Sequence, residues 1–120
     1  MALTVTGFST TALDYKIVNE SGSVNTMDGN VTGSSGSLYF LDIDNQVSAV
    51  MYIKVYTTAN AVIADDPSIK FELASTAKEK IVFPDGLAFT ELSFFSTTTK
   101  ATSGSPSAPG GTVTITAVTS

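Results

Sequence analysis

The sequence has no cysteine, no histidine, no tryptophan and no arginine. Without cysteine there is no disulfide, no thiolate nucleophile and no cysteine-ligated metal centre. Without histidine the commonest general base and the commonest metal ligand at neutral pH are both missing. These absences argue against catalysis, and we expect a protein that is not an enzyme and carries no cofactor.

Positive charge is also scarce, since six lysines stand against eleven acidic residues and the net charge is -5. An acidic chain without arginine lacks both the counterion release and the bidentate base contacts that hold nucleic acid. No apolar run approaches the roughly 18 residues that span a bilayer, and the N-terminal MALTVTGFST lacks the charged and apolar regions of a signal peptide. We therefore expect neither nucleic acid nor membrane as a partner, and synthesis in the cytoplasm.

Serine and threonine, by contrast, occupy 33 of the 120 positions. Threonine and valine favour strands, whereas glycine, serine, asparagine and aspartate separate them. Apolar and polar residues alternate with the period of two that is typical of strands in eight segments, which are 3–8, 14–19, 36–44, 48–57, 68–73, 79–83, 87–95 and 111–118. The sequence therefore predicts an all-β fold, an antiparallel β-sandwich of the jelly-roll type.

A single domain is expected over residues 1–120, because a chain of this length can bury one sizeable core. It would comprise a short N-terminal arm (1–8) and two long polar loops (19–36 and 96–111) beside the strands. Loops of this length in a compact domain are usually functional or disordered. We therefore expect the functional surface to involve these loops.

Alternation also predicts which side chains face the core. In MYIKVY (51–56), Met51, Ile53 and Val55 form one apolar face, which should point inward. The last strand should present a threonine face to water or to a neighbouring molecule, made by Thr112, Thr114 and Thr116.

The stretch IVFPDGLAFTELSFF (81–95) places a Pro-Asp-Gly corner between two apolar runs. Proline presets the φ angle of the first corner residue, and glycine tolerates the positive φ that such turns need. We expect a type I or type II turn here between two strands. In the second strand, Phe89 and Phe95 fall on the side of Glu91, opposite the core-facing positions, so both faces are apolar. This pattern predicts a sheet covered by another subunit or by a capsid.

The acidic residues form no convincing metal site. Asp42, Asp44 and Asn45 end a strand, but no glycine follows for the turn of a calcium loop and no glutamate closes it. We expect Asp42 and Asp44 to share the solvent face of the strand and Asn45 to help to turn it. Asp65 and Asp66 are adjacent and point in opposite directions in an extended chain, so they are best explained as turn residues before a proline. We expect no metal ion.

The remaining residues suggest two alternative functions, carbohydrate binding and a hydrolase or lyase activity. Tyr52 and Tyr56 lie on one strand face, separated by Lys54, at a spacing that could stack against a sugar ring. A hydrolase or lyase would have to rely on aspartate, lysine and tyrosine alone, and no converging pair is evident in the sequence. The tyrosine platform makes carbohydrate binding the main alternative.

A longer pattern covers residues 50–119. It runs in order through a YIKVY strand, an acidic turn with proline that leads to IKFEL, a lysine-rich approach to FPDGLAF, an LSFF strand, a Thr/Ser/Gly/Pro loop and a closing TVTITAV strand. In this layout the chain resembles small β-sandwich accessory virion proteins of tailed bacteriophages, of the capsid decoration or cement type. The resemblance lies in the order of the strands and in the residues of the turns, and it includes no catalytic signature.

The resemblance implies a structural virion protein that binds the outside of the phage head and stabilises it, with a small tail or neck component as the alternative. The implied partner is the major capsid protein, the implied assembly is a homotrimer, and the implied location is the virion surface. The residues expected at an interface are Leu3, Val5, Phe8, Phe89, Glu91, Phe95, Thr112, Thr114 and Thr116.

Overall fold

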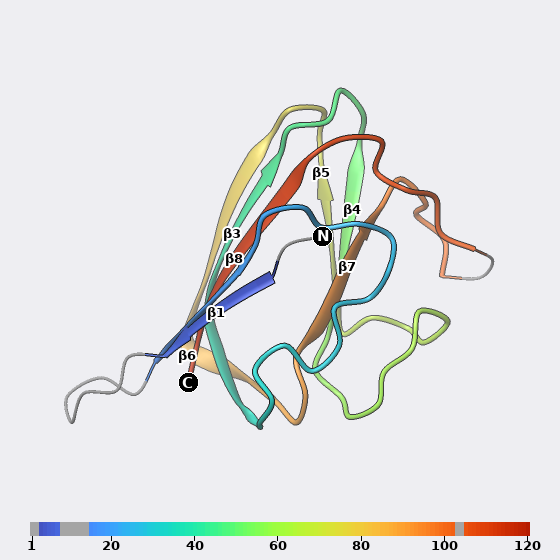
Figure 1. Cartoon of the computed structure of the whole chain (residues 1–120). Helices are drawn as coiled ribbons and strands as arrows, with labels where there is room; N and C mark the ends of the chain where they lie inside the picture. Colours follow the sequence, from blue (N-terminus) through green and yellow to red (C-terminus); the bar gives the residue numbers. More distant parts are fainter. Residues whose placement is uncertain (1–2, 8–14, 103–104) are drawn as a thin grey trace.

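The computed structural model describes residues 3–7, 15–102 and 105–120 (Figure 1). These ranges contain eight strands and no helix, so no helix in them is long and apolar enough to cross a membrane. The strands are β1 (Leu3–Gly7), β2 (Lys16–Glu20), β3 (Gly36–Asn45), β4 (Met51–Tyr56), β5 (Ile69–Leu73), β6 (Lys78–Phe89), β7 (Ser93–Thr97) and β8 (Val113–Thr119). The prediction of an all-β fold is confirmed.

The strands form two antiparallel sheets that share one hydrophobic core. The larger sheet has the order β1-β2-β8-β3-β6, and the smaller has the order β5-β4-β7 (Figure 1). The inward positions alternate as strand geometry requires. Met51, Ile53 and Val55 of β4 are buried in this core, as predicted, together with Ile43 of β3 and Ile115 of β8.

The Pro-Asp-Gly corner does not separate two strands, and this prediction was wrong. Strand β6 continues through it from Lys78 to Phe89. Its pairing with β3 shifts between Leu38, which lies opposite Leu87, and Phe40, which lies opposite Val82, so the corner bulges out of a continuous ladder. Because β6 is an edge strand, proline removes no ladder hydrogen bond that a neighbour requires.

Gly86 is the residue that makes this bulge possible. Its φ is 76°, the left-handed region expected from the turn sequence. A Cβ added at this position would lie 2.9 Å from the Tyr39 ring and 3.0 Å from the Ser37 Cβ. The sequence thus predicted the conformation of this glycine correctly, although the corner belongs to a bulge and the chain leaves the sheet only after Phe89.

The apolar residues on both faces of β7 are covered by the chain itself. Phe94 faces the core, while Phe95 faces away from it and stacks on Tyr56 with ring centroids 6.1 Å apart. The Lys54 ammonium lies 5.5 Å from the Phe95 ring centroid and donates a hydrogen bond of 2.8 Å to the carbonyl of Ala101. The loop that follows β7 therefore covers this face, where the sequence predicted a partner.

The segment between β2 and β3 covers the free edge of β7. Asp28 and Phe94 exchange backbone hydrogen bonds of 2.8 and 3.1 Å, and Val31 N donates to the Leu92 carbonyl. On the other side of this bridge, Ser96 N donates to the carbonyl of Val24. The long polar loop predicted over 19–36 thus supplies the backbone partners that an edge strand would otherwise lack.

Asn45 joins three segments at the end of β3. Its buried amide nitrogen donates to the carbonyls of Ala49 and Ala74, at 3.0 and 2.9 Å, and its amide oxygen accepts from Val47 N at 3.0 Å. The sequence predicted that Asn45 helps to turn the strand. The contact with Ala74 shows that it also ties the turn after β5 to the turn after β3.

We predict that Asn45→Asp lowers the free energy of unfolding by about 3 kcal/mol, because a carboxylate oxygen would face two carbonyl oxygens in place of two hydrogen bonds. Urea unfolding at pH 7 measures this loss. The matched control is Asn19→Asp on an exposed position of β2, which should change stability by less than about 0.5 kcal/mol. Equal losses in the two variants would contradict the role given to Asn45.

Candidate functional site

The outer face of the five-stranded sheet carries an uninterrupted row of apolar side chains. Strand pairing places Ile17 of β2 opposite Val118 of β8, and Val118 opposite Phe40 of β3. Phe40 in turn lies opposite Val82 of β6. We call these four residues the apolar row. Since neighbouring strands lie about 4.8 Å apart, the row extends over roughly 14 Å.

The apolar row is accessible to solvent. Val82 is 63 % exposed, and Ile17, Phe40 and Val118 are partly exposed. Phe40 follows Tyr39, whose ring meets the ring of Tyr15 edge to face with centroids 5.5 Å apart. Scattered apolar residues on a surface are ordinary, but a contiguous row across four strands is typical of a contact surface.

Beside the apolar row, the same face has a shallow hollow of about 260 Å³ with charged walls. It is lined by Asp42, Asp44, Lys78, Lys80, Thr114 and Thr116. The register sets Asp42 opposite Lys80 and Asp44 opposite Lys78, so each carboxylate of β3 faces an ammonium of β6. The prediction that Asp42 and Asp44 share the solvent face of a strand is confirmed.

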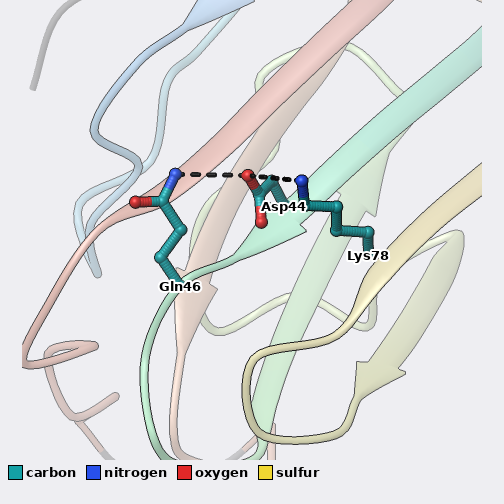
Figure 2. Close-up of polar contacts among 3 residues, drawn as sticks. All are labelled: Asp44, Gln46 and Lys78. Atoms are coloured by element: carbon teal, nitrogen blue, oxygen red, sulfur yellow. Dashed lines mark hydrogen bonds and ion pairs between the residues drawn. The ribbon is translucent and has the colours of Figure 1, made fainter.

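The polar side chains in and beside the hollow form weak contacts with one another. The Asp44 carboxylate lies 3.9 Å from the Lys78 ammonium and accepts a hydrogen bond of 3.2 Å from the Gln46 amide (Figure 2). The Lys78 side chain is largely exposed, so this ion pair adds little to stability. In the part of the chain that the structure describes, no three acidic side chains come close enough to hold a metal ion. The hollow thus contains two pairs of opposite charges and two threonine hydroxyls.

The residues expected at an interface have different positions. Leu3 and Val5 are 40 % and 43 % exposed on β1. Of the predicted threonine face, Thr112 is exposed and Thr114 and Thr116 are partly exposed. Phe8 lies outside the described residues. The sequence pattern did not reveal that the threonines adjoin the Asp-Lys pairs, because that arrangement depends on the register of β3, β6 and β8.

The other three expected interface residues make contacts within the chain. Phe89 belongs to the hydrophobic core, and Phe95 is enclosed beneath Tyr56 and Lys54, so neither side chain reaches the surface. Glu91 is partly buried, and its carboxylate accepts from Asn60 N at 3.2 and 3.3 Å. These positions do not fit contact with a partner.

The tyrosine platform for a sugar is also absent. Tyr56 is buried, and its hydroxyl lies within hydrogen-bonding distance of the carbonyls of Ile63 and Asp65, at 3.4 and 3.1 Å. Burial raises the pKa of this phenol, and nearby Asp65 and Asp66 add to the effect. Asp65 accepts a hydrogen bond from Val62 N, which confirms its predicted role in a turn. Tyr52 alone remains partly exposed.

Two further buried titratable groups carry the pKa shifts that often mark catalytic residues. Burial, together with a hydrogen bond to Glu20 and the charge of that side chain, raises the pKa of Asp28 to about 7. Burial lowers the pKa of Lys54, and the charge of Lys70 acts in the same direction. The sequence predicted neither effect, because both depend on how loops fold over strand ends.

Both groups are enclosed and serve the fold. Glu20 and Asp28 are buried, and Glu20 accepts from Gly22 N at 3.0 Å, so the carboxyl pair links the end of β2 to the segment that covers β7. Lys54 is buried as well and binds a loop carbonyl. Neither group lines the hollow on the outer face.

Comparison with protein-family models, with curated proteins and with solved structures finds no significant match to this chain.

We predict that stability falls as the pH rises from about 4 to about 7, through the interval between the ordinary pKa of Asp28 and its folded value. In that interval the folded chain keeps a proton that the unfolded chain releases, so each rise in pH favours unfolding. Asp28→Asn, which keeps the shape of the neutral carboxyl, should remove this decline. Thermal unfolding between pH 4 and 8 measures it. Asp85→Asn on the exposed bulge is the control, and a decline that persists in Asp28→Asn would refute the assignment.

Proposed function

We propose that this chain is a structural virion protein of a tailed bacteriophage, without enzymatic activity, that binds the outside of the head as a decoration or cement protein. Its fold is then best described as a jelly-roll-like β-sandwich, its partner is the major capsid protein, and its location is the virion surface. The observation that carries the proposal is the apolar row, because it lies on a sheet face that no described segment of the chain covers.

The layout of the outer face suits a protein contact. The apolar row lies at one side of the paired charges of Asp42, Asp44, Lys78 and Lys80. Protein interfaces commonly combine an apolar centre with a polar rim that fixes orientation. The paired charges are close to neutral in sum, so a partner covering the apolar row would meet no strong field of one sign beside it.

The arrangement of titratable groups supports a role other than catalysis. The groups whose pKa is shifted, Asp28, Lys54 and Tyr56, are enclosed. On the outer face, the carboxylates of Asp42 and Asp44 lie opposite Lys80 and Lys78. A general acid or base has to reach its substrate within hydrogen-bond distance. The carbohydrate alternative is weakened in the same way by the burial of Tyr56.

We predict that Val82→Asp abolishes binding to phage particles that lack this protein, because a carboxylate would be buried in the contact without a partner. Co-sedimentation with particles measures the bound fraction. Val62→Asp is the matched control, since Val62 is 55 % exposed in the loop between β4 and β5, and it should bind normally. Undiminished binding of Val82→Asp would remove the apolar row as the contact surface.

Imaging of particles with and without the protein tests the location independently of any variant. Added density on the outer surface of the head would agree with the proposal. Density at the neck or tail would instead favour the alternative of a tail-associated component. Val82→Asp would then test whether the apolar row makes that contact.

A further inference from the structure

Strand β1 forms an open edge of the five-stranded sheet. It pairs with β2 along one side, and no other strand in residues 3–7, 15–102 and 105–120 pairs with its opposite side (Figure 1). Leu3 and Val5 pair with Glu20 and Val18, so they lie on the inward face of the sheet. Both nevertheless remain about two-fifths exposed, because little of the smaller sheet lies over them.

The other three sheet edges are protected against pairing with a further strand. The β6 edge carries Lys78, Glu79 and Lys80, and it is broken by the bulge at 84–86. The β5 edge carries Lys70 and Glu72. The β7 edge has no charge, but the segment from Val24 to Val31 pairs with it. Charges, proline, bulges and covering segments are the devices by which proteins prevent edge-to-edge association.

Within residues 3–7, 15–102 and 105–120, the β1 edge has none of these devices. Its sequence, LTVTG, contains no charge and no proline, its pairing with β2 is regular, and its described side chains are exposed. An edge strand with this composition is a template for a further strand, joined through backbone hydrogen bonds.

We propose that β1 pairs antiparallel with β1 of a second copy of this chain about a two-fold axis through Val5. The two five-stranded sheets then form one continuous sheet of ten strands. Centred on Val5, the pairing sets Thr4 opposite Thr6 of the second copy and Val5 opposite its own equivalent. Cross-strand threonine pairs and pairs of β-branched residues are favourable, and no charges meet.

The sequence of the strand favours a second copy as the occupant. In an isologous pairing centred on Val5, Thr-Val-Thr sets threonine opposite threonine and valine opposite valine, so the strand is complementary to itself. The exposed Leu3 and Val5 of both copies would come together on the inward face of the joined sheet, which removes apolar surface that each copy alone leaves in water.

This inference does not rest on the proposed function and differs from the homotrimer that the resemblance implies. A two-fold pairing through β1 gives a dimer, and the apolar row stays free because it lies on the opposite face of the sheet. A dimer that fails to bind particles would overturn the proposed function alone. A trimer that binds particles would overturn the β1 pairing alone.

Sedimentation over a range of concentrations tests the pairing. We expect twice the mass of one chain at high concentration, and Val5→Lys should raise the dissociation constant at least about tenfold because two ammonium groups would meet at the axis. Val50→Lys is the control, since Val50 is 41 % exposed at a site outside the strands, and it should leave the constant within about twofold. A monomer at millimolar concentration would overturn the proposal.

Cross-linking tests the register and does not depend on the effect of a charge. The chain has no cysteine, so Val5→Cys introduces a single thiol. Opposed residues of antiparallel strands have Cα atoms about 4.5 to 5.5 Å apart, within the range that a disulfide spans. Mild oxidation should therefore convert Val5→Cys to a covalent dimer, whereas Val50→Cys should remain monomeric. Failure of Val5→Cys to cross-link faster than Val50→Cys would exclude an axis at Val5.

Discussion

Strand β7 has to be covered on both faces and along one edge, and most irregular segments of the chain are arranged to do this. Its five residues are all buried, although it belongs to a sheet of only three strands. The core covers Phe94, the loop after β7 covers Phe95 with the help of Lys54, and the segment after β2 pairs with the edge. Long polar loops thus act as a second layer, because they carry the backbone donors and acceptors that a buried edge requires.

The need to cover β7 also explains why charged side chains are buried inside the fold. Lys54 lies on the side of β4 that faces away from the core, where the loop after β7 encloses it. Its ammonium donates a hydrogen bond to the carbonyl of Ala101 and lies over the Phe95 ring. Asp28 is buried because its segment, between β2 and β3, pairs with β7, and its carboxyl forms a hydrogen bond with that of Glu20. Perturbed pKa values are often associated with catalysis, but here they follow from loops that close over strands.

The surface that remains after this closure has two unusual parts. One is the apolar row on the outer face of the large sheet, which crosses four strands beside paired aspartates and lysines. The other is the uncharged β1 edge, which contrasts with three protected edges. The apolar row lies on the outer face of the sheet and β1 lies at its edge, so a contact with another protein and a contact between copies can coexist.

The sequence by itself determined the all-β class, most strand positions, the inward face of β4 and the positive φ of Gly86, because these depend on local periodicity and on single-residue conformational preferences. It did not reveal that β6 runs through its Pro-Asp-Gly corner, that Phe95 and Tyr56 are enclosed, or that Ile17, Phe40, Val82 and Val118 form one row. Those features were decided only by the tertiary structure, since each depends on the register between strands or on loops that close over them, and both join residues far apart in the chain.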